Sequence, residues 1–181
     1  MASHNAGEVQ IVGPDAEIES RALITFVRFP DRIRPIATDT TTVPITAIDS
    51  FAVKLEVDRA RVPSGGVDLA LHRLPVTIDS TATFSSLVPN FEDSSLVGTI
   101  SITGDLTSDN VSLVLPTSAF PTFDADDRQA AIGVRISRGD SSFVSLSTQL
   151  VGAGPELTRF FKIDSSGVTI ERSDARRAGF T

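Results

Sequence analysis

The chain contains few residues that could act as an acid or a base in catalysis. Its histidines are His4 and His72, and it has no cysteine. A hydrolase needs a nucleophile, a base and an orienting acid, so this shortage of bases weighs against catalysis. His4 lies near the N-terminus, and His72 falls on the polar side of an alternating segment, which predicts a surface or interface residue. The P-loop, nucleophile-elbow and zinc-protease motifs are also missing from the sequence. We therefore expect no catalytic residue, no cofactor and no enzyme activity.

Asp124, Asp126 and Asp127 form the densest acidic group and are the candidate metal ligands. Calcium takes about six to eight oxygen ligands, and three carboxylates in one loop could supply several of them. The spacing lacks the glycine turn and the bidentate Glu of an EF-hand loop. Acidic side chains also stabilise the N-terminus of a helix. The prediction is that these aspartates flank a short helical turn within residues 124–131 and hold no metal.

Arg138-Gly139-Asp140 is the tripeptide that integrin ligands present on exposed loops. Gly-Asp is also favoured in a tight turn between two strands, because both residues tolerate positive φ. The N-terminus lacks the basic start and the apolar run of a secretion signal. We therefore interpret the tripeptide as a turn.

Composition and charge argue against several other functions. The chain has 181 residues, a formal net charge of -7 and a pI of about 4.7. An acidic chain repels the phosphate backbone, which argues against direct nucleic-acid binding. There are 11 Phe but no Trp or Tyr, the residues that usually stack on sugar rings, which argues against a lectin. No apolar stretch is long enough to span a membrane, so we expect no membrane partner and a location in a virion or in the cytoplasm.

The elements that hold these residues are predicted to be β-strands. In Phe51–Asp58 apolar residues alternate with polar ones, so one face of the strand is buried and the other is solvated. Similar segments, separated by turn residues, recur from Leu23 to Arg172. The pattern predicts an all-β antiparallel sandwich, jelly-roll-like, with roughly nine to eleven strands and at most short helical turns. Val67–His72 is predicted to form a hairpin with Phe51–Asp58.

The predicted domain boundaries follow changes in composition. Residues 1–20 carry acidic side chains and no Lys or Arg, which predicts an N-terminal arm or a loosely held first strand at Val9–Val12. Residues 21–172 are predicted to form a single β-sandwich domain. Residues 173–181 are predicted to be a charged C-terminal tail.

Two places carry more large apolar residues than one sandwich core would bury. Arg21–Phe29 is apolar at both parities of a strand, and two phenylalanines are adjacent at 160 and 161. Leaving such a side chain in water costs about 1.5–3 kcal/mol relative to burial, and a sizeable exposed patch usually indicates an interface. The predicted interface residues are Leu23, Phe26, Phe29, Phe160 and Phe161.

In its organisation the chain resembles the single-domain coat or decoration proteins of viruses and phages. That resemblance implies a non-enzymatic, self-assembling structural protein that forms homo-oligomers through strand faces and terminal arms and contacts other virion proteins. The alternative is a monomeric β-sandwich module that binds a carbohydrate or a peptide. Such a module would need a concave site with convergent polar groups.

Overall fold

The computed structural model describes residues 8–13, 20–58, 60, 62–77, 83–103, 108–138, 143–147 and 154–180. The strands are β1 (Glu8–Val12), β2 (Ala22–Phe26), β3 (Arg32–Ile33), β4 (Val43–Glu56), β5 (Val67–Leu74), β6 (Leu96–Ile102), β7 (Asn110–Pro116), β8 (Ala130–Arg138), β9 (Phe143–Ser147), β10 (Glu156–Ser165) and β11 (Val168–Phe180). The helical segments are α1 (Phe84–Leu87) and the short 3-10 helices η2 (Val88–Phe91), η3 (Asp93–Ser95) and η4 (Thr117–Ala119). The strands pair antiparallel, which confirms the predicted all-β fold with only short helical turns.

One large curled sheet forms most of the molecule. It has nine strands in the order β3-β4-β10-β11-β2-β8-β5-β6, with β7 paired to β4, while β1 and β9 form a separate two-stranded sheet. The large sheet curls until β6 lies beside β7, where a Cβ on Gly98 would lie 2.5 Å from Leu113 Cδ2. The inner face of this curled sheet therefore encloses the core, as the two facing sheets of a sandwich do.

The predicted alternation of Phe51–Asp58 is confirmed. Phe51, Val53, Leu55 and Val57 are buried, whereas Lys54 is partly exposed. The buried residues belong to one apolar cluster that also draws side chains from β2, β5, β8 and β10. The regular alternation of β4 thus produces the inner wall of the core.

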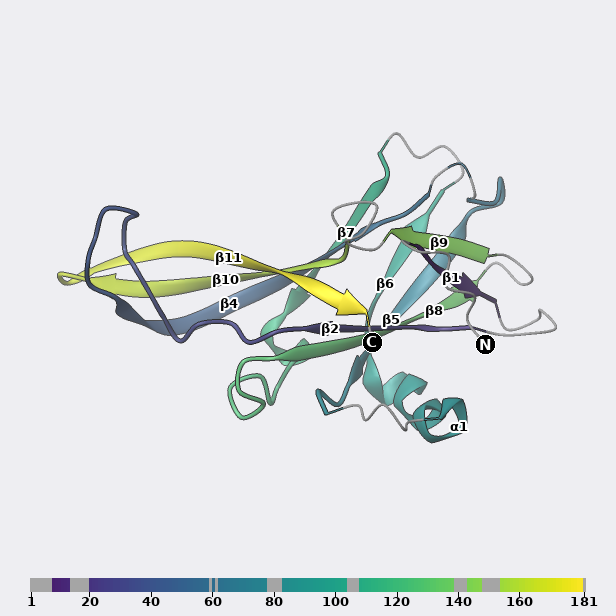
Figure 1. Ribbon diagram of the computed structural model, residues 1–181, viewed down its shortest axis with the longest axis horizontal. Helices are drawn as coiled ribbons and strands as arrows, with labels where there is room; N and C mark the ends of the chain where they lie inside the picture. The colour runs from purple at the N-terminus through teal and green to yellow at the C-terminus, as the bar shows by residue number, and fades with distance from the viewer. Residues whose placement is uncertain are drawn as a thin grey trace.

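The ends of β4, β10 and β11 extend beyond the rest of the sheet. In Figure 1 they run side by side away from the body that contains β5, β6 and β8. β4 is 14 residues long, so it pairs with β10 on one edge and with both β3 and β7 on the other. β10 and β11 form a hairpin, which turns at Ser166 and Gly167 with φ of 57° and 79°.

The segment of residues 28–35, which we call the crossing segment, follows β2 and includes β3. It must pass over β11 and β10, because these strands lie between β2 and β4 in the sheet. Pro30 and Pro35 cannot donate to a strand ladder, and only Arg32–Ile33 pairs with β4. Asp31 O accepts from the backbone N–H of Ile45, but the carbonyls of residues 28–30 and of Pro35 accept from side-chain donors.

Residues 83–95, which we call the cover, lie over β5 and β8, on the face of the sheet opposite the main core. The cover consists of α1, η2 and η3. Phe91 of the cover packs with Leu74 and Ala131 in a second apolar cluster, which Leu23 also contacts. The body of the sheet is therefore covered on both faces at this point.

The predicted hairpin between Phe51–Asp58 and Val67–His72 is wrong. β5 pairs with β6 and β8, and both edges of β4 are occupied by other strands. The turn at Pro63–Gly66 does exist, with Gly66 N bonded to Pro63 O, but it leads the chain to the other half of the curled sheet.

The predicted C-terminal boundary is corrected, whereas the first strand predicted at Val9–Val12 is present as β1. Residues 173–180 are not a tail but belong to β11, where Ala178 pairs with Phe26 of β2 and is buried. At the other end, β1 pairs with β9, and Ile11 is buried in the main core. Part of the predicted N-terminal arm is thus a strand held within this chain, because its apolar side chain is needed to fill the core.

Candidate functional site

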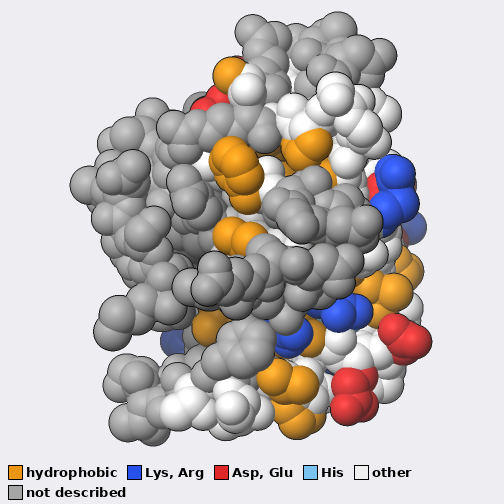
Figure 2. Space-filling view, turned by 90° about the vertical axis from the view of Figure 1, so that its right-hand side faces the viewer, with side chains coloured by type: hydrophobic (Ala, Val, Ile, Leu, Met, Phe, Trp, Pro, Cys, Tyr) orange, Lys and Arg blue, Asp and Glu red, His pale blue; other side chains and the backbone are white. Residues whose placement is uncertain are grey.

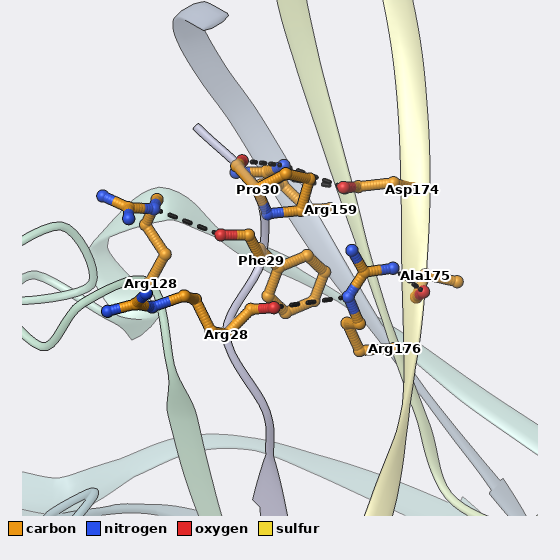
Figure 3. Close-up of polar contacts among 8 residues, drawn as sticks. All are labelled: Arg28, Phe29, Pro30, Arg128, Arg159, Asp174, Ala175 and Arg176. Carbon is orange, nitrogen blue, oxygen red and sulfur yellow. Dashed lines mark hydrogen bonds and ion pairs between the residues drawn. The ribbon is translucent and has the colours of Figure 1, made fainter. Parts of the chain in front are cut away.

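Arginines on β10 and β11 supply the donors that the crossing segment lacks. Figure 3 shows two of them, Arg159 and Arg176, beside the backbone of Arg28, Phe29 and Pro30. Arg159 Nη2 donates to Pro30 O at 2.9 Å, Arg176 Nε to Arg28 O at 3.4 Å, and Arg172 Nη2 to Pro35 O at 2.9 Å. From the other side, Arg128 Nε donates to Phe29 O at 3.1 Å. Arginine suits this task because one guanidinium carries several donors in a fixed fork.

Arg159 is the most buried of these cations, at 1% exposure. Its Nε and Nη2 donate to the two carboxylate oxygens of Asp174 at 3.0 and 2.8 Å. The guanidinium carbon lies 5.1 Å from the ring centroid of Phe29 and 4.8 Å from that of Phe161. The buried charge is thus neutralised by a bidentate carboxylate and surrounded by aromatic rings. These contacts assign Arg159 to holding the crossing segment in place.

The interface prediction is wrong for three of its residues. Phe26, Phe29 and Phe161 are buried within the chain, so they are not available to a second subunit. Phe29 fits because the crossing segment turns it onto Phe123, with ring centroids 5.6 Å apart, and Leu23 reaches the second cluster under the cover. The structure buries apolar residues of both parities by covering both faces of the sheet. Phe160 alone of the predicted set is classed as exposed, at 38%.

Phe160 lies on the outer face of the four strands β7, β4, β10 and β11, which we call the outer face. The strand register places Pro116, Ser50, Phe160 and Ser173 in one row across these strands. The next row contains Val114, Ala52, Thr158 and Ala175. Neither row contains a charged side chain, most of its residues are small, and Val114 is 69% exposed. The two rows therefore form an uncharged strip.

Charged residues of both signs border this strip. On one side Glu156 pairs in register with Lys54 and Arg177, and Arg177 Nε lies 4.0 Å from Glu156 Oε2. On the other side Lys162 pairs in register with Glu171, and its Nζ lies 3.2 Å from Asp49 Oδ1. An uncharged centre with a charged rim is the usual anatomy of a protein–protein interface.

The end of the molecule away from the extended ends of β4, β10 and β11 looks different. In Figure 2 the hydrophobic side chains coloured at that end form separate groups, with Lys, Arg, Asp and Glu side chains near them. Single apolar side chains at a surface are common and need no partner. We therefore take the outer face as the candidate functional surface.

His72 is buried, at 0% exposure, which corrects the prediction of a surface residue. It does lie on the side of β5 opposite Leu69 and Leu71, as the alternation predicts, but the cover fills that side. Arg135 Nε donates to His72 Nε2 at 3.2 Å, and His72 Nδ1 lies 3.0 Å from Ser95 Oγ. Burial, assisted by the neighbouring Arg135 charge, lowers the pKa of His72 below its usual range.

The acidic group does not flank a helix, because residues 121–128 form successive turns instead. Thr122 Oγ1 donates to Asp126 Oδ2 at 2.6 Å, and Asp127 pairs with Arg28 and Arg128. Asp127 and Arg128 have φ of 57° and 59°, so the left-handed backbone interrupts any helix. Among the described residues, no three Asp, Glu or His side chains gather as a metal site would require.

Arg138 of the predicted turn tripeptide has a defined partner. Its Nε donates to Asp68 Oδ2 at 2.6 Å, and this hydrogen bond, with one from Ser101, lowers the pKa of the Asp68 carboxyl. Gly139 and Asp140 lie outside the described residues. The arginine of the tripeptide thus joins the end of β8 to β5.

A cavity of about 390 Å³ lies between β4 and the 117–124 segment. Its lining includes Phe51, Phe120 and Phe123, whose exposures are only 1%, 6% and 4%. These rings contact one another, with Phe51 centroids 5.1 Å from those of both neighbours. Because the ring faces are used inside the core, they do not provide a platform for stacking a sugar.

Comparison with known proteins does not assign the chain to a family. No family model matches it, and neither does any curated protein. Within the described ranges, none of the helices has the length and apolar character needed to cross a membrane.

The sequence signal for the outer face was present but easily overlooked. Ser50, Ala52, Thr158 and Ala175 are small residues at alternate positions of strands that the register brings together. Small polar residues on a strand usually indicate nothing more than a solvated face. Only the pairing of β4 with β7 and β10 reveals that they form one continuous strip.

Proposed function

We propose that this chain is a non-catalytic structural subunit that self-associates, of the kind that forms the coat of a virus or phage or decorates its surface. The observation that carries the proposal is the outer face, where uncharged rows from β7, β4, β10 and β11 lie between charged rows. Two such faces can pack as a pair of aligned sheets. Because each rim holds both signs of charge, a two-fold related copy can place Lys or Arg opposite Asp or Glu.

The alternative, a monomeric module for a carbohydrate or peptide, is less well supported. Its binding surface would need exposed aromatic faces or convergent polar groups. The phenylalanines of the largest aromatic group are at most 6% exposed, and the arginines of the crossing segment are bonded to backbone carbonyls. The proposal therefore rests on a surface and not on a pocket.

A Val114→Asp variant is expected to weaken self-association at least about tenfold, which corresponds to about 1.4 kcal/mol. The substitution places an unpaired charge at the uncharged strip, and a buried unpaired charge is costly. The dissociation constant would be measured by light scattering over a concentration series, with negative-stain microscopy of the assemblies. Because Val114 is 69% exposed, the thermal stability of the single subunit should hardly change.

Val168→Asp is the matched control, since Val168 is 60% exposed but lies at the hairpin turn and outside the uncharged rows. It should associate like the unmodified protein. A protein that remains monomeric at high concentration, or equal losses in the two variants, would contradict the proposal.

A further inference from the structure

The cover contacts the sheet at Gly133, where the absence of a side chain leaves space for the Phe91 ring. His72 of β5 pairs in register with Gly133 of β8, and Gly133 pairs with Leu23 of β2. A Cβ at Gly133 would lie 2.5 Å from Phe91 Cε1 and Cζ, so the Phe91 ring occupies the space that a side chain would take. The same ring lies 5.3 Å from the His72 ring, centroid to centroid. The imidazole is thus a neighbour of the main apolar anchor of the cover.

The hydrogen bonds around His72 fix its protonation state. Ser95 Oγ lies 2.6 Å from Asn90 O and 2.8 Å from Glu92 O, so its single hydrogen is donated to a carbonyl of the cover. Its oxygen therefore accepts from His72 Nδ1–H. On the other side, His72 Nε2 must accept, because the guanidinium of Arg135 can only donate. Both contacts require the neutral imidazole with its hydrogen on Nδ1.

Protonation would place an N–H of the imidazole against an N–H of Arg135 and a positive charge beside another. The charged groups that face His72 are Arg135 on β8, Arg21 next to β2, and Asp93 on the cover. Arg21 lies 4.5 Å from the Phe91 ring centroid, so the cations border both the imidazole and the anchor ring. A hydrogen bond to the Glu92 backbone and the charge of Asp93 favour the charged form, but burial and the two arginines oppose it more strongly.

We propose that His72 is a proton-operated latch, which holds the cover closed while its imidazole is neutral and releases the cover when the imidazole is protonated. Release breaks the link through Ser95 and uncovers Leu74, Ala131 and the sheet side of Phe91, which form the second apolar cluster. The main core, which lies on the other face of the sheet, stays intact. The latch therefore turns a fall in pH into an exposed apolar surface.

The sign of the pH dependence follows from linkage. The pKa of His72 is lowered when the cover is closed and returns toward about 6.5 when it is released, so protons favour the released form. The cover is held fully above about pH 6.5. Below that, down to the pKa of the closed form, each pH unit raises the ratio of released to closed cover about tenfold.

Hydrogen exchange of the backbone amides in residues 84–95 measures the opening directly. After correction for intrinsic exchange rates, we expect these amides to lose protection between about pH 7.5 and about pH 5, while amides of β4 keep theirs. His72→Gln should abolish this change, and His4→Gln, which removes the other histidine, should leave it unaltered. Unchanged protection in the unmodified protein, or the same pH dependence in His72→Gln, would overturn the proposal.

Nuclear magnetic resonance of labelled histidine covers the case in which His72→Gln opens the cover at every pH. The His72 titration in the unmodified protein should then have the same midpoint as the loss of protection in residues 84–95. Separate midpoints for the His72 titration and the opening would overturn the latch. Coinciding midpoints would support it.

Discussion

An Asp174→Ala variant is expected to lose about 3–5 kcal/mol of its free energy of unfolding, because it leaves the Arg159 charge buried without a partner. Arg159 is 1% exposed and donates hydrogen bonds to both carboxylate oxygens of Asp174 at 2.8–3.0 Å. The rings of Phe29 and Phe161 lie 5.1 and 4.8 Å from the guanidinium carbon, so apolar groups border the charge that the variant leaves without a counter-ion. Since a domain is typically stable by about 5–15 kcal/mol, this loss is large. Urea denaturation at neutral pH measures it.

Arg177→Ala on the same strand is the control for this experiment. The Arg177 side chain is 60% exposed and lies 4.0 Å from Glu156, so its removal should cost less than about 1 kcal/mol. A double variant, Arg159→Met with Asp174→Leu, removes the charge together with its partner and should recover part of the loss. Recovery will be incomplete, because Pro30 O then lacks its donor. Equal stability of Asp174→Ala and Arg177→Ala would show that the buried ion pair does not hold the crossing segment.

Phe51→Ala should destabilise the protein by about 3–5 kcal/mol, through lost burial and the cavity that remains. Phe51 is 1% exposed, and its ring meets Phe120 and Phe123 edge-on, each at 5.1 Å between centroids. These partners come from the 117–123 segment, which has no strand of its own to hold it. Removal of the Phe51 ring should therefore also increase hydrogen exchange in the 117–123 segment.

Phe160→Ala provides a comparison with the same chemistry at a different exposure. Phe160 is on β10, next to β4, but points to the outer face and is 38% exposed. The single subunit should lose less than about 1 kcal/mol in thermal or urea denaturation. If the two alanine variants are equally unstable, the assignment of inner and outer faces of these strands is wrong.

The strand content was predictable because its signal is local. In β4 the side-chain alternation lies within the segment itself, and residues 51–56 form the strand that the sequence predicts. Strand pairing depends on segments far apart in the chain. Nothing near Val67–His72 indicates that β4 already has partners on both edges, so the predicted hairpin was wrong.

The difference between local signals and contacts between distant segments also explains why several candidate site residues were wrongly predicted. Phe29 looks like an interface residue until the crossing segment is seen to pass over β10 and β11, where it becomes core. His72 looks exposed until the cover is placed on the other side of β5. A partial signal was available for the arginines: Arg172, Asp174 and Arg176 alternate on one strand opposite Arg159 and Phe161. The proline-containing segment of residues 28–35 has carbonyls that accept from these arginines. Only the topology shows that the segment and the arginines lie together.

The position of β2 in the large sheet has a consequence for how the chain folds. β2 has β8 on one edge and β11 on the other, so residues 22–26 await partners at residues 130–134 and 178–180. Pairings between such distant residues carry a high loop-closure entropy, and domains rich in them fold slowly. During synthesis on the ribosome, β2 would emerge early with both edges unpaired and with Ile24 and Phe26 unburied. Slow refolding and aggregation at high protein concentration are therefore expected from the topology itself, whatever the final stability.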